Sequence, residues 1–170
     1  MASNKLRYTC YRSALGDILI ASLDGAVTDV AIRGTEAGFV EGLESRWGPG
    51  VDMSRDGSSF SGLFTEFDEY FSGKPVVFNT RLMLLGTPFE RAVWEVLRDI
   101  PRGETRCYGE VASRAGSPGA ARAVGRACAR NPVPIIVPCH RVVRADGSIG
   151  GYSGGVDIKR ELLKIEGNFL

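Results

Sequence analysis

The stretch that decides the fold of the second half of the chain is residues 108–130, which read YGEVASRAGSPGAARAVGRACAR. Residues 108–115 favour a short helix, Gly116-Ser117-Pro118-Gly119 a tight turn, and residues 120–130 a second helix. Two helices joined by a Gly-containing turn of about four residues are typical of a helix-turn-helix unit. Asn131-Pro132 ends the second helix, because the residue before a proline disfavours the α conformation.

The second of these helices has a basic face. Arg122, Arg126 and Arg130 recur at i, i+4 and i+8, so their side chains share one side of the helix, and alanines keep much of the rest slim. Residues 101–170 hold 11 Lys and Arg against 6 Asp and Glu, whereas residues 1–100 hold 10 against 14. This asymmetry favours a polyanionic partner for the second half. A solvated arginine face is the competing interpretation.

Upstream, the sequence predicts a small sheet with helices. Residues 6–12, 17–23 and 26–33 alternate or run apolar between Gly-containing turns, which indicates three strands of an antiparallel meander. Residues 36–47 and 60–71 favour helices because apolar residues recur at a spacing of three to four. The remaining segments are a predicted loop at 48–59 and strands or extended connections at 76–78 and 82–85.

A domain boundary is expected near Gly86. Thr87-Pro88-Phe89-Glu90 fits a capping box with proline at the first helical position, and the helix that it opens stops at Pro101 and Gly103. We therefore expect an α+β protein with two domains, residues 1–85 and 86–170.

Composition narrows the class of protein. A content of 44% hydrophobic and 24% charged residues is typical of soluble globular chains, and no apolar run approaches the roughly 20 residues that span a bilayer. The first residues lack the apolar core of a signal peptide, so we expect an intracellular protein without a membrane partner. The one histidine, His140, excludes a zinc site built on two histidines, and Cys10, Cys107 and Cys128 have no assigned role. We expect no metal and no cofactor.

The single histidine directly follows a cysteine, Cys139. A free thiol has a pKa of about 8.5 and needs a base to become a nucleophile, and histidine is the usual base. Adjacent side chains on extended backbone point in opposite directions, so coupling requires a turn after Pro138 or a bridging water. Taken alone, the pair is weak evidence for a nucleophile, because a buried structural cysteine beside an incidental histidine is the more frequent case.

The segments around this pair are predicted from local signals. Residues 133–137 are apolar and extended, but Pro134 excludes them from a central strand. Asp146-Gly147 indicates a hairpin-type turn between residues 142–143 and Ile149. Residues 152–155 form a loop, and residues 158–165 form a last helix that closes at Gly167.

Residues 131–143 read NPVPIIVPCHRVV, and this run resembles the signature of the O6-alkylguanine-DNA alkyltransferases. Matching motifs follow in order from Gly86 to Gly167, about half of the chain. The first 85 residues resemble the family only in their strand-rich layout. The resemblance implies a ribonuclease H-like N-terminal domain and a winged-helix-like, helix-turn-helix C-terminal domain. Some family members bind zinc in the N-terminal domain, and this chain lacks the histidines for it.

The resemblance also implies residue roles. Cys139 matches the acceptor, His140 its general base acting through a water, and Glu166 the carboxylate partner of His140. Asn131 matches the residue that holds the turn after the recognition helix, and Arg122 the one that fills the space of the extruded nucleotide. Further implied contacts are Tyr108 with the guanine and its nucleotide backbone, Val142, Tyr152 and Ser153 in the guanine pocket, and Gly109, Ser117, Arg126 and Arg144 with DNA.

The implied function is single-turnover repair of double-stranded DNA. An alkyl group moves irreversibly from O6-alkylguanine, and from O4-alkylthymine, to Cys139 after the nucleotide is flipped out, which is methylated-DNA–protein-cysteine methyltransferase activity. We expect a monomer, with cooperative DNA binding left open, in the cytoplasm at the nucleoid, or in the nucleus of a eukaryote.

Three other functions compete with this one. An alkyltransferase-like protein that only flags lesions has its acceptor replaced, so Cys139 argues against it. A helix-turn-helix regulator leaves Cys139, His140 and Glu166 unexplained. A cysteine hydrolase would turn over, which the transfer reaction forbids.

Overall fold

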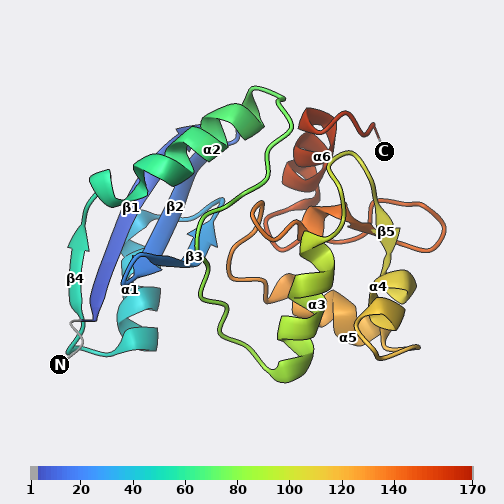
Figure 1. Ribbon diagram of the computed structural model, residues 1–170, viewed down its shortest axis with the longest axis horizontal. Helices are drawn as coiled ribbons and strands as arrows, with labels where there is room; N and C mark the ends of the chain where they lie inside the picture. Colours follow the sequence, from blue (N-terminus) through green and yellow to red (C-terminus); the bar gives the residue numbers. More distant parts are fainter. Residues whose placement is uncertain (1–3, 170) are drawn as a thin grey trace. The chain divides into compact units, whose positions relative to one another are not determined.

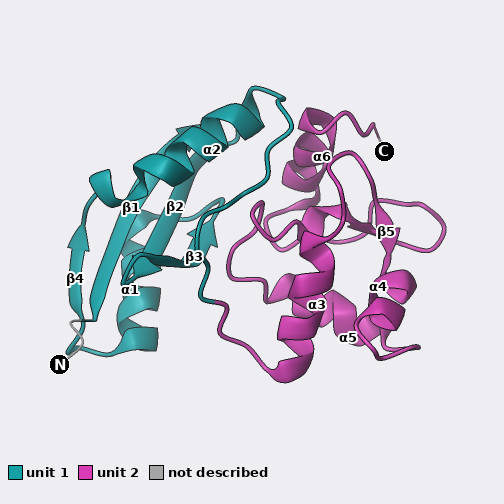
Figure 2. Cartoon of the chain, in the orientation of Figure 1, with its two compact units in different colours: residues 1–83 teal, residues 84–170 magenta. Residues whose placement is uncertain are grey.

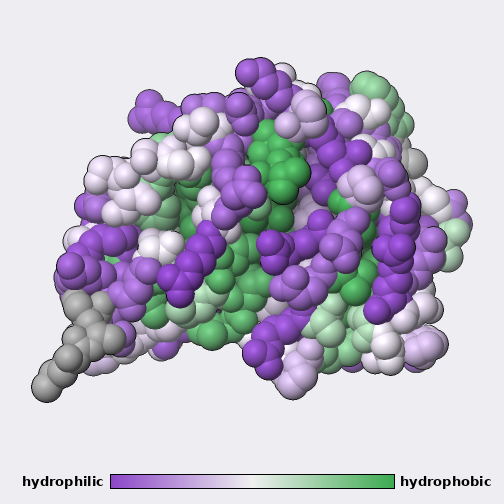
Figure 3. Space-filling model, in the orientation of Figure 1, coloured by the Kyte–Doolittle hydropathy of each residue, from purple (hydrophilic) through white to green (hydrophobic). Residues whose placement is uncertain are grey.

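The computed structural model describes residues 4–169, and the chain divides into two compact units, residues 1–83 and 84–170 (Figures 1 and 2). The first unit holds the larger sheet and the second most of the helices, so the predicted α+β class is confirmed. None of the helices in the described part is both long and apolar enough to cross a bilayer. Hydrophilic side chains are spread over the face shown in Figure 3, with apolar ones between them.

A four-stranded sheet in the order β3-β2-β1-β4 forms the first unit. The predicted antiparallel meander is present as β1 (Lys5–Ser13), β2 (Gly16–Leu23) and β3 (Ala26–Ala31). The predicted loop over 48–59 is wrong in part, since β4 (Asp52–Arg55) pairs in parallel with β1. This polar edge strand carries neither apolar alternation nor an apolar run, and so lacks the usual strand signal.

Two helices cover opposite faces of this sheet. Side chains alternate along β1, which places Leu6 on one face and Tyr11 on the other. Leu6 packs with Leu43 of α1 (Glu36–Trp47), and Tyr11 packs on the phenylalanines of α2 (Ser61–Phe71), which the 3-10 turn η1 (Ser58–Phe60) precedes. Segment 76–85 contributes one isolated bridge, Leu82 to Val27, so it is an extended connection.

The second unit begins with α3 (Pro88–Arg98), and its predicted capping box is present. Thr87 Oγ1 accepts from the Glu90 N–H at 3.2 Å, and a Glu90 carboxylate oxygen accepts from the Thr87 N–H at 2.8 Å. A Cβ on Gly86 would lie 2.5 Å from the Trp94 ring, so only glycine fits there. The Trp94 indole donates to the Ala127 carbonyl at 2.9 Å and ties α3 to α5 (Ala121–Ala129).

The helix-turn-helix prediction is confirmed by α4 (Tyr108–Arg114) and α5, with a tight turn between them. The Ser117 N–H donates to the Ala112 carbonyl at 2.9 Å and closes that turn. The last predicted helix is α6 (Val156–Ile165), and Gly167 follows it with a φ of 83°.

Two local predictions in this unit are wrong. The predicted hairpin around Asp146-Gly147 is not formed. The Arg144 N–H donates to the Ser148 carbonyl and closes a turn, but Ile149 forms no strand. Instead β6 (Val142–Val143) pairs in parallel with β5 (Arg106–Cys107). Residues 133–137 form a buried turn and not an extended run, because the Val137 N–H donates back to the Val133 carbonyl at 3.0 Å.

Candidate active site

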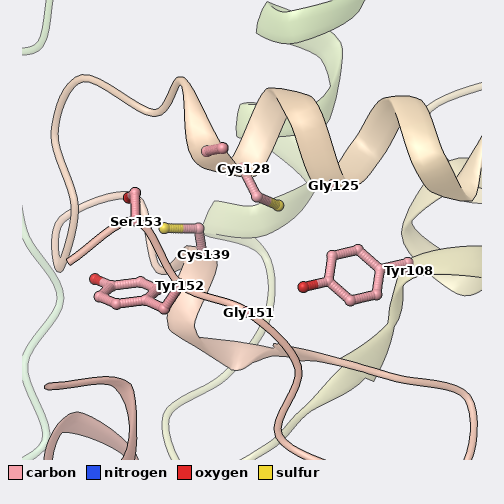
Figure 4. Close-up of a pocket in the computed structure, with 8 residues that line it drawn as sticks. Tyr108, Gly125, Cys128, Cys139, Gly151, Tyr152 and Ser153 are labelled. Atoms are coloured by element: carbon pink, nitrogen blue, oxygen red, sulfur yellow. The ribbon is translucent and has the colours of Figure 1, made fainter. Parts of the chain in front are cut away.

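Cys139 opens η2 (Cys139–Arg141), a 3-10 turn, and is only 3% exposed. Its side chain reaches a pocket of about 300 Å³ (Figure 4). The pocket lies wholly within the second unit and is lined by Tyr108, Gly125, Cys128, Ala129, Cys139, Gly151, Tyr152 and Ser153. Of the predicted pocket residues, Tyr152 and Ser153 line it, as does Tyr108, whereas Val142 lies in β6, completely buried. Sequence reasoning missed the small residues of α5, which leave room beside Cys139.

Asn131 holds the segment that carries the thiol. Its side-chain amide donates to the Val137 carbonyl at 2.7 Å and to the Cys139 sulfur at 3.2 Å, and its oxygen accepts from the Val133 N–H at 3.0 Å. Burial raises the pKa of the Cys139 thiol, while the bond from Asn131 and the nearby Lys159 ammonium work against that rise. The resting sulfur is therefore a protonated thiol at neutral pH.

His140 and Glu166 meet in the interior. His140 Nε2 lies 2.7 Å from Glu166 Oε1, and neither side chain is exposed. Burial lowers the pKa of His140, and the Glu166 carboxylate raises it in part. The turn of η2 replaces the extended backbone that would have sent the Cys139 and His140 side chains in opposite directions.

Two buried cations of the site were missed by sequence reasoning. Arg141 donates through Nε to Glu166 Oε2 and through Nη2 to Oε1, both at 2.9 Å. Lys159 is completely buried and donates from Nζ to the Val142 carbonyl at 2.5 Å and to the Gly151 carbonyl at 3.3 Å. Burial lowers the pKa of Lys159 to about 8.

One sequence signal could have found Lys159, but none marks Arg141. Lys159 stands between Ile158 and Leu162 on the apolar stripe of α6, where a lysine is out of place. Arg141 precedes an apolar pair and has no periodic pattern around it. Both residue types are normally expected at the surface.

Cys128 lies in the same pocket as Cys139. Figure 4 shows the Cys139 sulfur on the side of Ser153 and the Cys128 sulfur on the side of Tyr108. Burial raises the pKa of Cys128. Cys128 is thus a protonated wall residue at neutral pH.

The predicted DNA-contacting residues lie on α4, α5 and the loops beside them. Arg122 and Arg126 are exposed on α5, while Arg130, also exposed, bonds to Glu90 at 3.0 Å. Arg144 is exposed after β6. Gly109 and Ser117 are half-buried in the first turn of α4 and in the α4–α5 turn.

The described residues contain no group of three or more His, Cys, Asp or Glu side chains that could hold a metal ion.

The predicted basic stripe on α5 is not uniform. The guanidinium of Arg130 is paired with Glu90, at the N-terminal end of α3.

Comparison with known proteins gives matches along nearly the whole chain. Residues 88–168 match the family model described as 6-O-methylguanine DNA methyltransferase, DNA binding domain, and residues 6–84 match its ribonuclease-like domain. The methylated-DNA–protein-cysteine methyltransferase of Mycobacterium tuberculosis H37Rv is 42% identical over 161 residues, 95% of this chain and 92% of that protein. The protein of the same name from Methanosarcina acetivorans is 39% identical over 166 residues, covering 95% and 98%.

Solved structures agree with these matches. The Mycobacterium tuberculosis OGT in complex with DNA superposes with a TM-score of 0.82 at 39% identity, over 94% of this chain and 92% of that one. The O6-methylguanine-DNA methyltransferase from Pyrococcus kodakaraensis gives a TM-score of 0.68 at 32% identity, covering 95% and 99%.

Proposed function

Because the chain belongs to the 6-O-methylguanine DNA methyltransferase family, we propose that Cys139 is the thiol to which it transfers the alkyl group. The chain is a DNA repair methyltransferase that moves an alkyl group from O6-alkylguanine in DNA to its own cysteine. The observation that carries the assignment is the position of Cys139, which is buried at a pocket with Asn131 on its sulfur and is followed in sequence by His140, the partner of Glu166.

The transfer is a displacement at the alkyl carbon. The Cys139 thiol gives its proton to His140 through a water, and the sulfur forms a bond to carbon while the bond from carbon to guanine O6 breaks. With Nε2–H donating to Glu166, Nδ1 is the basic nitrogen of a neutral His140. The departing guanine keeps the electron pair and takes a proton, and we assign its donation to Tyr108 or Ser153, whose hydroxyl-bearing side chains line the pocket.

The product explains why each molecule reacts once. A thioether has no good leaving group, so nothing restores the thiol. Cys139 is consumed, and the amount of DNA repaired equals the amount of protein used.

DNA contact is assigned to α5 and its neighbours. The O6-alkyl group lies inside the base stack, so the nucleotide must be extruded at a cost of a few kcal/mol, and we assign Arg122 to the vacated space. Gly109, Ser117, Arg126 and Arg144 are assigned to the DNA backbone. This contact should weaken with salt, because arginines displace counterions from phosphates.

The finer features of this function are part of the proposal. O4-alkylthymine is a second substrate, the partner is duplex DNA, and the chain acts on it as a monomer. Its place is the cytoplasm at the nucleoid, in line with relatives from bacteria and archaea.

Intact-mass measurement tests the assignment. Incubation with a duplex that contains O6-methylguanine should add one CH2 group, about 14 Da, to the Cys139 peptide, in a one-to-one ratio. Modification at another residue would show that Cys139 is not the alkyl acceptor. Repeated turnover would overturn the single-use mechanism.

A further inference from the structure

Glu166 is shared between two partners of different charge. Its Oε1 accepts from His140 Nε2 at 2.7 Å and from Arg141 Nη2 at 2.9 Å. Its Oε2 accepts from Arg141 Nε at 2.9 Å and from the Gly103 N–H at 3.3 Å. The side chains of His140 and Glu166 are 0% exposed and that of Arg141 is 10% exposed. A planar guanidinium therefore holds the carboxylate in a two-point contact inside the protein.

The sharing matters because a carboxylate beside an imidazole favours the protonated ring. An imidazolium cannot take a proton from a thiol. A buried Glu166 that faced His140 alone would favour protonated His140 before the reaction, and so remove the base. Arg141 stays charged at all physiological pH values and offsets the negative charge of Glu166. The pair Glu166–Arg141 is neutral as a unit, so no net negative charge beside His140 favours the protonated ring.

We propose that Arg141 is a positioning residue for the transfer reaction: it neutralises Glu166, and so keeps His140 uncharged and able to accept the proton of Cys139. This inference rests on the proposed role of His140 as the base. Arg141 does not line the pocket; it acts through its contact with Glu166 and through its charge beside His140.

The contact also fixes which nitrogen of His140 is basic. Arg141 Nη1 donates to the Ile100 carbonyl at 2.5 Å, which anchors the guanidinium to the chain just after α3. Arg141 thus holds both carboxylate oxygens of Glu166 and keeps Oε1 in contact with His140 Nε2. The Nε2–H of His140 therefore keeps donating to Glu166, and the lone pair of the ring stays on Nδ1.

The other charged groups around His140 act in known directions. Glu166, directly after α6, raises the pKa of His140. The Lys159 ammonium of α6 lowers it, and so does Arg141, which follows His140 on η2. Burial, the largest influence, also lowers it. Cys139 precedes it on η2, and Arg102, after α3, donates to the Ile165 carbonyl next to Glu166. Removing Arg141 removes one of the two cations that oppose Glu166.

The experiment uses the chain's only histidine, whose imidazole signals in NMR need no assignment. In the full-length protein we expect a neutral ring with the proton on Nε2 at pH 7. Arg141→Met should move the titration midpoint of His140 to higher pH. The acid limb of the transfer-rate profile should move with it, and the rate at pH 7 should fall roughly tenfold for each unit by which the midpoint rises above pH 7. Arg141→Lys, which keeps the charge, should leave the midpoint near that of the wild type.

Three results would overturn the proposal. The first is an imidazolium at pH 7 in the wild-type protein. This result needs no variant, so the proposal stays testable even if Arg141→Met fails to fold. The second is a folded Arg141→Met variant with a lower melting temperature but an unchanged titration midpoint of His140. That result would show that Arg141 has only a structural role. A midpoint that moves to lower pH shows that Glu166 takes up the proton instead.

The proposed function and this inference fail separately, because the titration needs no alkylated DNA. A midpoint that responds to Arg141 in a protein that never alkylates Cys139 would refute the function alone. Normal alkylation with an unresponsive midpoint would refute the inference alone.

Discussion

The two units bury different kinds of side chain. In the described part of the first, residues 4–83, the buried polar residues are three hydroxyl side chains and one carboxylate, Asp29, around an apolar and aromatic core. In the second, the buried polar residues are all charged or titratable: Glu90, His140, Arg141, Lys159 and Glu166. Burying charge costs free energy, and perturbed titratable groups gather where chemistry takes place. The contrast indicates that the first interior serves folding and the second serves the reaction.

The largest expected effect separates the cysteines of the two units. Cys139→Ser should abolish alkyl transfer while DNA binding remains, because a hydroxyl is a far weaker nucleophile than a thiol that can lose its proton. Cys10→Ser, in the first unit, is the matched control and should transfer at the wild-type rate. Cys128→Ser tests the second thiol of the pocket and should still accept one alkyl group. Intact mass and a gel-shift assay measure both properties, and transfer in Cys139→Ser would break the contrast.

The next effect compares one buried carboxylate from each unit. Glu166→Gln should slow transfer by about 10²- to 10⁴-fold, the usual contribution of acid–base assistance. Asp29→Asn changes a buried carboxylate that pairs with Arg46, and should leave the rate of the folded protein unaltered. Single-turnover kinetics on O6-methylguanine duplex provide the comparison. Equal losses in the two variants would show that the charged interior of the second unit has no special part in the reaction.

A smaller effect is expected on the surface. Arg122→Ala should slow repair of duplex DNA about tenfold, since the arginine then no longer offsets its part of the few kcal/mol that nucleotide extrusion costs. Reaction with the free base O6-benzylguanine should change much less. Arg55→Ala, an exposed arginine of the first unit, is the control for charge alone. Equal slowing on duplex and on free base would refute the base-replacement role of Arg122.

The smallest effect is a difference in acid stability. Burial raises the pKa of Glu166, but hydrogen bonds from His140 and Arg141 and the charge of Arg141 outweigh burial and hold this pKa below its usual range. Its stabilising contribution is therefore lost as pH falls below about 4.3. His140, with a lowered pKa, costs stability in the same direction below about 6.5. Burial raises the pKa of Asp29, so acid favours the folded state there. Hydrogen-exchange protection should therefore fall first in residues 84–170, and earlier loss in residues 1–83 would contradict the assignment.

Local signals predicted most of the fold. The meander, the helix over 36–47 and the capping box at Thr87 follow from short-range periodicity and capping chemistry, which act within a few residues. β4 did not follow, because a polar edge strand is defined by its partner β1, some 47 positions earlier in the pairing of Asp52 with Lys5. Long-range pairing leaves no local trace.

The candidate site divides in the same way. Cys139, His140 and Glu166 were identified through a motif that resembles a known family, and the structure brings the last two into contact. Arg141 and Lys159 were missed because their burial depends on carbonyls and a carboxylate supplied by distant segments. The turn over residues 133–137 was missed for a different reason: Ile135 adopts a φ of 75°, which a β-branched residue seldom does, so sequence preference pointed away from it.

The near-complete burial of Cys139 has a consequence for how long an unused molecule lasts. A protein that works once must survive intact until it meets a lesion, in a cell that contains soluble electrophiles and oxidants. Those reagents attack thiolates that are open to solvent, and Cys139 is neither ionised nor open at rest. Selectivity for DNA damage thus begins before any DNA is bound, because the resting thiol is protected from reagents that do not bind in the pocket beside it.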